Sequence, residues 1–433
     1  MPDTYPSSQD LYLFHQGTLY QSWKMLGSKL CEKDGVKGVR FTVWAPNAHS
    51  VAVAGSFNSW NGWDYRMEKI PDSGIWTLFV PGVEEGALYK YAVTGADGAT
   101  RMKADPYAIH SEMRPNTASI VRSLDYRWKD DHWVRTRQRV YDKPLNIYEV
   151  HLGSWRKNGA EFCSYEQYAS SLVDYVKEMN YTHIELLPLS EHPFDGSWGY
   201  QSTGYFSATS RYGTPQQLMH LIDRCHENGI GVIMDWVPGH FCKDEHGLRL
   251  FDGGPQYEPW DLGRSEKWKW GTLSFDFGKP EVACFLISNA LFWLDVYHID
   301  GIRIDAVASM TNLNFDKDEH EKIYNIHGGA ENLEAIAFIR NLNTAVFKFF
   351  PHALMIAEDS SDWKGITAPV HEGGFGFNYK WKMGWMNDTL RYMETATVHR
   401  RYHHNLITFS MVYAYAENFV LPLSHDEVVH GKH

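Results

Sequence analysis

Acidic residues stand at or just after the ends of four short apolar runs in this sequence. Asp235 follows 231–234, Asp305 follows 301–304, Glu358 follows 354–357, and Asp426 comes three residues after 419–423. A single acid after a strand often does no more than cap the next helix. Four such acids together indicate glycoside chemistry, which needs one ionised carboxylate as nucleophile and one protonated carboxyl group as acid.

Arg303 strengthens this interpretation. It stands two residues before Asp305, and residues two apart on a strand point to the same face. A guanidinium there favours the ionised form of the carboxylate beside it. Gathering several carboxylates in one place costs electrostatic energy, so a purely structural role explains the set less well.

Other chemistries lack their sequence patterns. The chain has no GxSxG turn and no glycine-rich phosphate loop. Its five cysteines are scattered without CxxC spacing, so we expect reduced thiols and neither disulfides nor a zinc site. The histidines of the segment 425–430 (HDEVVH) are five residues apart and would not share a helix face to hold zinc. We therefore expect no metal and no cofactor.

The elements that must position the carboxylates follow from the hydrophobic pattern. After residue 145, apolar runs alternate with helical periodicity, which is typical of βα units. Strands are predicted at 145–150, 183–187, 231–237, 301–304, 353–357 and 419–423, and helices at 164–179, 214–228, 279–297 and 333–350. A doubly wound sheet would normally carry a phosphate turn, so the pattern favours an α/β fold of the (β/α)8-barrel type. Barrel active sites lie at the C-terminal ends of the strands, where the carboxylates stand.

The segment before the barrel reads as β structure. Period-two alternation predicts strands at 38–44, 49–55, 76–80 and 88–93, which indicates an all-β, immunoglobulin-like sandwich. A turn in it carries Trp60 and Trp63, whose rings either fold back on the sandwich or form a platform for sugars. We expect a lead-in at 1–30, the sandwich at 31–115, a connector at 116–143 and the barrel at 144–433, with a long insert between residues 239 and 280.

Composition limits the partners. The chain has 433 residues, with 41 basic and 53 acidic side chains and a net charge of −12. This acidic balance argues against nucleic acid and anionic membranes, which are bound by lysine and arginine clusters. No apolar run approaches the roughly 18 residues of a membrane span. The first residues lack the pattern of a secretory signal, so we expect a cytoplasmic protein, with a monomer favoured. Aromatic residues reach 15%, including 17 tryptophans, which suits sugar binding as well as a large core.

Four segments in this order resemble the signature regions of the α-amylase superfamily. They are 235–240 (DWVPGH), 301–307 (GIRIDAV), 357–360 (AEDS) and 423–426 (LSHD). Within that superfamily the chain is most similar to the branching enzymes that act on 1,4-α-glucan (glycogen). The distinguishing segments are 148–155 (YEVHLGSW), 191–193 (EHP), 198–205 (WGYQSTGY), 328–336 (GGAENLEAI) and 421–432 (LPLSHDEVVHGK). The sandwich looks like the glycogen-binding module that precedes such barrels.

This resemblance implies a role for each matching residue. Asp305 would be the nucleophile, Glu358 the general acid and then base, and Asp426 the group that stabilises the oxocarbenium-like transition state. Arg303 would orient Asp305. Tyr200, Asp235, His240 and His425 would bind the sugar at the point of cleavage. Tyr200 taken alone would indicate core packing, but within this motif the sugar site is favoured. The implied reaction cleaves α-1,4-glucan chains and re-attaches them as α-1,6 branches in glycogen biosynthesis, with retention of configuration.

Alternatives remain at this stage. An α-amylase-type hydrolase, such as one acting on glycosyl-trehalose, would use the same carboxylates. Members of the family continue through an eighth βα unit and a C-terminal β-sandwich, which we do not recognise before His433, so we expect a truncated barrel. An inactive glucan-binding fragment is therefore a third possibility. Gly239 replaces the asparagine that serves a calcium site in many α-amylases, so no structural calcium is expected.

Overall fold

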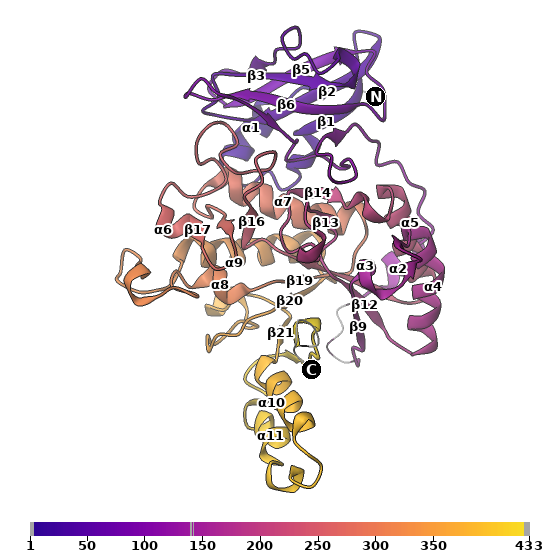
Figure 1. The fold of residues 1–433 in the computed structure, drawn as a ribbon, viewed down its shortest axis with the longest axis vertical. Coiled ribbons are helices and arrows are strands. Elements are labelled where there is room, and N and C mark those ends of the chain that lie inside the picture. The colour runs from indigo at the N-terminus through magenta and orange to yellow at the C-terminus, as the bar shows by residue number, and fades with distance from the viewer. Residues whose placement is uncertain (1–3, 139–140, 142, 428–433) are drawn as a thin grey trace. The chain divides into compact units, whose positions relative to one another are not determined.

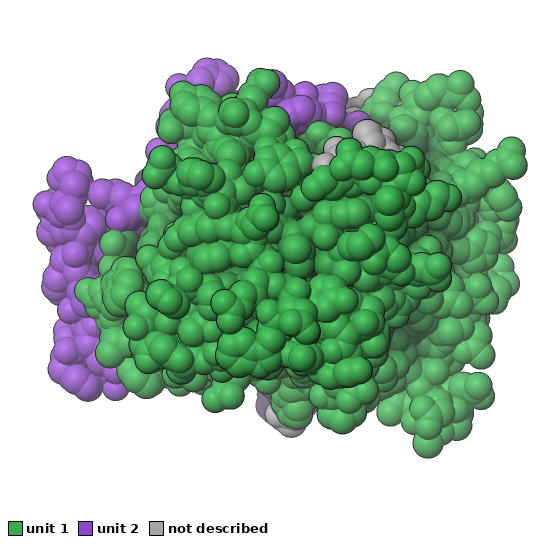
Figure 2. Space-filling model, turned by 90° about the horizontal axis from the view of Figure 1, so that it is seen from above, with its two compact units in different colours: residues 1–299 green, residues 300–433 purple. Residues whose placement is uncertain are grey.

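The computed structural model describes residues 4–138, 141 and 143–427. The chain forms two compact units, residues 1–299 and residues 300–433, which are coloured separately in Figure 2. No helix among the described residues is both long enough and apolar enough to cross a bilayer.

The N-terminal part of the first unit is a sandwich of two antiparallel sheets (Figure 1). One sheet runs β1 (Gly27–Lys33), β2 (Val36–Trp44), β5 (Ile75–Pro81), β4 (Glu68–Lys69). The other contains β3 (Ser50–Gly55), β6 (Leu88–Thr94), β7 (Thr100–Lys103) and β8 (Ser119–Ile120). Alternate residues of β6 are buried, and Tyr89 of β6 meets Phe41 of β2 with ring centroids 4.9 Å apart. The period-two pattern predicted β2, β3, β5 and β6, because alternation appears where a strand buries one face more than the other. It did not indicate β1, which is seven residues long.

Three parallel strands follow in the same unit, in the order β15 (Gly231–Trp236), β12 (His183–Leu186), β9 (Ile147–Val150). The helices between them, α4 (Tyr165–Glu178) and α5 (Pro215–Glu227), pack against each other (Figure 1). Both helices begin with a capping box: Ser164 and Thr214 each accept a hydrogen bond from the backbone N–H three residues on. These caps satisfy N–H groups that have no partner within the helix.

The segment between β15 and the long buried helix α7 (Pro280–Val296) forms the predicted insert. It contains a three-stranded antiparallel sheet in the order β16 (His240–Cys242), β18 (Thr272–Ser274), β17 (Glu266–Lys267), with α6 (Leu262–Ser265) before β17. The shorter elements of this unit are α1 (Ser8–His15), α2 (Asp131–Thr136), α3 (Leu152–Trp155), β10 (Lys157–Asn158), β11 (Glu161–Phe162), β13 (Ser190–Glu191) and β14 (Gly204–Ala208).

Buried polar contacts attach the sandwich to this insert. The Lys103 ammonium donates to the carbonyls of Glu245, Gly247 and Arg249. At the end of β2, the Gln256 amide donates to the Trp44 carbonyl, and in the turn that follows, Asn47 N–H donates to Asp252, each over 2.7 Å. These bonds satisfy loop carbonyls and a carboxylate that would otherwise be buried without partners.

The second unit contains four parallel strands in the order β19 (Gly301–Ile304), β20 (Leu354–Ala357), β21 (Tyr379–Trp381), β22 (Phe419–Val420). Its α-helices are α8 (Val307–Thr311), α9 (Leu333–Phe349), α10 (Met383–Glu394) and α11 (Asn405–Thr408). The apolar pattern did not indicate β21, which is three residues long and contains a lysine. The strand predicted at 419–423 ends at Val420, two residues before Pro422, which has no N–H to pair.

Candidate active site

The second unit brings Arg303, Asp305 and Glu358 together at the C-terminal ends of adjacent strands. Strands β19 and β20 pair in parallel with Ile304 beside Ala357, so the residues that follow them emerge next to each other. A guanidinium nitrogen of Arg303 lies 2.8 Å from Asp305 Oδ1, and another lies 3.9 Å from Glu358 Oε2. The side chain of Arg303 is fully buried, whereas those of Asp305 and Glu358 keep 16% and 15% exposure. One cation thus serves two carboxylates that remain accessible to a ligand.

Two features that the sequence did not indicate fix this cluster. The Arg303 guanidinium lies over the ring of Trp381, 4.2 Å from its centroid, in a contact that holds a buried cation against an aromatic face. Ala306 adopts a left-handed backbone conformation (φ 48°), which is uncommon for a residue with a Cβ. In this conformation its N–H donates to Glu358 Oε2. Strain of this kind is frequent at functional sites.

Asp359, the acid next to Glu358, has a structural partner. Its side chain is fully buried, and Lys380 Nζ lies 3.0 Å from its Oδ1. The same oxygen accepts from the backbone and hydroxyl of Ser361. Because β21 carries Lys380, this buried pair joins the loop after β20 to the next strand.

His425 and Asp426 lie in a short 3-10 turn, His425–Glu427, after β22. His425 Nε2 is 3.2 Å from Asp426 Oδ1, and the Asp426 side chain is 55% exposed. Asp426 is therefore much more solvated than Asp305 or Glu358. Residues 428–432 of the matching segment lie outside the described residues.

In the first unit, Asp235 lies in β15, His240 begins β16, and Tyr200 lies in the loop before β14. The Tyr200 hydroxyl donates to Asp235 Oδ2 over 2.5 Å, and Asp235 is buried. The His240 ring faces Trp270, with centroids 5.0 Å apart. Burial, with a smaller contribution from the positive charge of Lys267, lowers the pKa of His240 to about 3. His240 is therefore neutral at neutral pH and can both donate and accept a hydrogen bond.

Trp270 was missed by the sequence analysis. It lies in the insert segment 266–271 (EKWKWG), where two tryptophans within three residues were the available signal. The Gln201 amide also donates to its carbonyl over 3.4 Å. The turn before β18 thus contributes to the surroundings of His240.

The two sandwich tryptophans have exposed rings. Trp60 is 44% exposed and Trp63 is 75% exposed, and Arg66 lies over the Trp63 ring at 5.5 Å. Rings in such positions are available to an external ligand and do not pack into the sandwich core.

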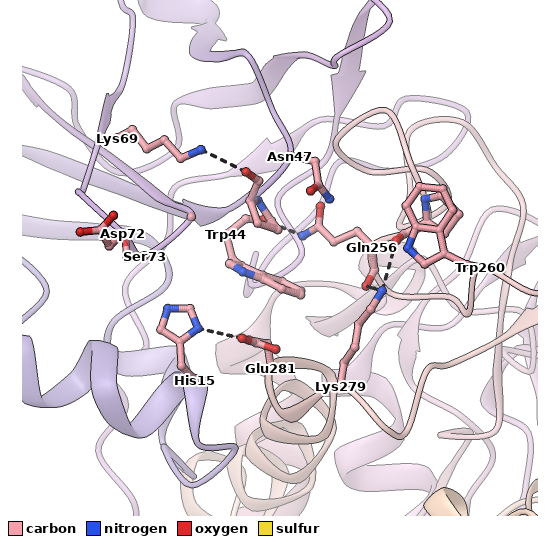
Figure 3. Close-up of a pocket in the computed structure, with 13 residues that line it drawn as sticks. His15, Trp44, Asn47, Lys69, Asp72, Ser73, Gln256, Trp260, Lys279 and Glu281 are labelled. Atoms are coloured by element: carbon pink, nitrogen blue, oxygen red, sulfur yellow. Dashed lines mark hydrogen bonds and ion pairs between the residues drawn. The ribbon is translucent and has the colours of Figure 1, made fainter. Parts of the chain in front are cut away.

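A cavity of about 720 Å³ lies elsewhere in the first unit, between the sandwich and the start of α7. Its walls include Trp44 and the exposed Trp260 (Figure 3). His15 and Glu281 face each other across 2.7 Å, while Lys279 donates to the carbonyls of Pro255 and Gln256. None of the site residues predicted from the sequence lines this cavity. In the part of the chain that the structure describes, no group of three histidine, cysteine or acidic side chains is arranged to hold a metal ion.

Comparison with protein families gives two matches. The family described as carbohydrate-binding module 48 (isoamylase N-terminal domain) matches residues 25–108. The family described as alpha amylase, catalytic domain, matches residues 169–253. The first match covers most of the sandwich, and the second runs from α4 to the insert.

Comparison with curated proteins finds relatives that match this chain over nearly its whole length. The chain is 59% identical to the 1,4-alpha-glucan branching enzyme GlgB of Halothermothrix orenii, and the match covers 100% of this chain and 69% of that protein. It is 52% identical to the protein of the same name from Bacillus subtilis, covering 99% of this chain and 67% of that protein. The chain thus spans about two thirds of the length of these relatives.

Among solved structures, the fold is similar to a putative alpha amylase from Salmonella typhimurium. The TM-score is 0.64 at 22% identity, over 88% of this chain and 57% of that one. The catalytic module of SpuA, a glycogen-degrading pneumococcal virulence factor, gives a TM-score of 0.58 at 22% identity, over 77% of this chain and 50% of that one. The predicted fold class is confirmed: a carbohydrate-binding sandwich followed by strands and helices of the (β/α)-barrel type.

Proposed function

Because this chain belongs to the 1,4-α-glucan branching enzymes of the α-amylase superfamily, we propose that it cleaves α-1,4-glucan chains and re-attaches them as α-1,6 branches. The observation that carries the chemistry is the contact of one buried guanidinium, Arg303, with the carboxylates of both Asp305 and Glu358. Retaining glycosidases need two carboxyl groups close to one scissile bond, one as nucleophile and one as acid.

The roles follow from the surroundings of each carboxylate. Arg303 stabilises negative charge on Asp305 at 2.8 Å, which suits a nucleophile that attacks the anomeric carbon. Glu358 is farther from the same cation and protonates the departing glycosidic oxygen. In the second step Glu358 removes the proton from the incoming hydroxyl as that oxygen displaces Asp305. Two inversions retain the α configuration.

The other predicted residues bind the glucan in this proposal. Tyr200 stacks on the sugar at the point of cleavage, while Asp235, His240 and His425 hydrogen-bond its hydroxyls. Asp426 stabilises the positive charge that develops on the sugar ring. The hydrogen bond from Tyr200 to Asp235 supports the first part, because it fixes the orientation of the ring beside a buried carboxylate.

We assign the sandwich, at 31–115, to the capture of glycogen, with 116–143 as connector and 144–433 as the catalytic part. Trp60 and Trp63 form the proposed platform, and their exposure supports this. The double variant Trp60→Ala, Trp63→Ala should migrate faster than the unmodified protein in native gels containing glycogen. The variant Tyr12→Ala, which removes a 65% exposed ring outside the sandwich strands, is the control. If glycogen retards the double variant as much as the unmodified protein, Trp60 and Trp63 do not form a glycogen-binding platform.

The relatives are named branching enzymes, which favours transfer of the cleaved glucan chain to a 6-hydroxyl group over transfer to water. Incubation with amylose tests this choice, with iodine colour, reducing ends and isoamylase-released chains measured together. Branching creates isoamylase-sensitive points without new reducing ends. A rise in reducing ends would identify a hydrolase, and glucan binding without any change in the polymer would identify a binding fragment.

We further propose a cytoplasmic monomer. All five cysteines are free thiols, as expected in a reducing compartment. A net charge of −12 opposes self-association. Sedimentation equilibrium at a mass other than 50.0 kDa would contradict the monomer.

A further inference from the structure

The turn between β17 and β18 carries an exposed indole. Trp268 begins this turn and is 62% exposed. The turn closes with hydrogen bonds from Trp270 N–H to Lys267 and from Gly271 N–H to Trp268, and Gly271 takes a positive φ of 66°. A glycine adopts this conformation without steric cost, so the turn is well defined.

This hairpin is attached to residues of the proposed sugar site. Strand β18 pairs with β16 so that Ser274 lies opposite His240. Two residues after Trp268, the ring of Trp270 faces the ring of His240, and the Trp270 carbonyl accepts from Gln201, the neighbour of Tyr200. Trp268 is therefore held at a fixed position close to Tyr200 and His240 within the first unit.

A cation also fixes the indole itself. Lys243 Nζ lies 5.3 Å from the centroid of the Trp268 ring and forms an ion pair with Glu266. The Glu266 side chain is only 12% exposed. Holding an exposed aromatic ring in this way reduces the conformational entropy that binding would otherwise cost. An apolar ring face flanked by an ammonium and a carboxylate also matches a sugar, which has an apolar C–H face and hydroxyl edges.

We propose that Trp268 stacks on a glucose unit of the α-1,4-glucan chain, away from the unit bound by Tyr200 and His240. Trp268 then extends the binding site along the chain and makes affinity depend on chain length. A short oligosaccharide fills only the positions near His240, whereas a longer one also reaches Trp268. This inference rests on the proposed function, because it takes the glucan near His240 as given.

Isothermal titration calorimetry with maltoheptaose and maltotriose tests the proposal. The protein carries Asp305→Asn to prevent turnover and Trp60→Ala with Trp63→Ala to remove the sandwich platform. Adding Trp268→Ala should raise the Kd for maltoheptaose roughly five- to tenfold, as expected for the loss of one aromatic contact. The Kd for maltotriose should change less than about twofold, and Trp268→Phe should restore most of the affinity for maltoheptaose. Tyr12→Ala, made in the same background, is the matched control for removing an exposed ring.

Equal affinity of the Trp268 and Trp268→Ala proteins for maltoheptaose, including no measurable binding to either, would overturn the proposal. An equal loss for both oligosaccharides would also overturn it, because it would show a local structural role. The amylose assay of the unmodified chain decides the proposed function separately. Binding that depends on Trp268 without branching would refute the function and keep the assignment of Trp268.

Discussion

Arg303 is the residue around which Asp305 and Glu358 are arranged. It is fully buried, lies against the Trp381 ring and contacts both Asp305 and Glu358. A buried cation is costly unless it is paired, so the two carboxylates stabilise Arg303 as much as Arg303 orients them.

Replacing Asp305, the proposed nucleophile, should stop turnover and leave binding intact. Asp305→Asn keeps the shape of the side chain but removes its negative charge, so kcat should fall at least about 1000-fold. The Kd for maltoheptaose should stay within about threefold of the original. The control Glu319→Gln removes a carboxylate of the same unit that is 88% exposed, and its activity should be unchanged. Substantial residual turnover by Asp305→Asn would contradict the assignment.

His240 should make the protein sensitive to acid. Its pKa is about 3 in the folded protein, whereas the unfolded chain has the ordinary value of 6.5. Between these values the unfolded state binds the additional proton, so stability is complete above pH 6.5 and falls as the pH falls toward 3. His240→Gln should reduce the stability lost between pH 7 and pH 5 by about 2 kcal/mol. Urea unfolding at both pH values measures this, with exposed His132→Gln as the control.

At the scale of elements, helix α7 supports the strand that carries Asp235. Asn289 of α7 is fully buried, and its side-chain oxygen accepts from the Trp236 indole over 2.8 Å. Its amide nitrogen donates to the Tyr205 carbonyl, and the Tyr205 hydroxyl donates to the carbonyl of His240. The helix thus connects the end of β15 with the beginning of β16.

Removing this link should destabilise the first unit. Asn289→Leu preserves the approximate volume but leaves the Trp236 N–H without its partner, which should lower the free energy of unfolding by about 1–3 kcal/mol. Trp293 also donates to the Tyr205 carbonyl, which limits the loss. Urea denaturation checks the value, and Asn158→Leu on the exposed strand β10 should be nearly neutral. An unchanged midpoint for Asn289→Leu would show that the link is dispensable.

At the scale of the molecule, Lys103 joins the sandwich to the barrel insert within the first unit. Burial lowers its pKa to about 8, so it remains charged at pH 7 while it donates to three loop carbonyls. Because these acceptors belong to residues 245–249, the sandwich and the insert should unfold together.

Lys103→Met should weaken this coupling. The substitution removes all three hydrogen bonds but keeps an apolar stem, so the calorimetric unfolding transition should move to lower temperature and broaden or divide. Lys69→Met removes an exposed lysine that bonds one carbonyl within the sandwich, and it should leave the transition unchanged. A single transition at the original temperature in Lys103→Met would refute the proposed coupling.

The sequence by itself predicted many of the strands and helices, although not α10, and it singled out the carboxylates that we propose as catalytic. Strands such as β15 and β20 were predictable because they are continuous apolar runs, and α4 and α5 because polar caps precede a helical period. Asp305 and Glu358 were predictable because the residues at the ends of parallel strands meet at one edge. The strand β21 was missed because it is short and a lysine interrupts its apolar run. Lys380 can be buried there only because it is paired with Asp359, a partner distant in sequence.

The tertiary structure decided how these residues are held. No local pattern indicated that Trp381 would lie under Arg303, that Ala306 would bond Glu358 in a left-handed conformation, or that Trp270 would face His240. Periodicity reports only which face of an element is buried. These contacts instead join residues up to 78 positions apart, from Arg303 to Trp381, and depend on how separate elements pack. The tertiary structure alone therefore determines which neighbour each proposed catalytic or sugar-binding group meets.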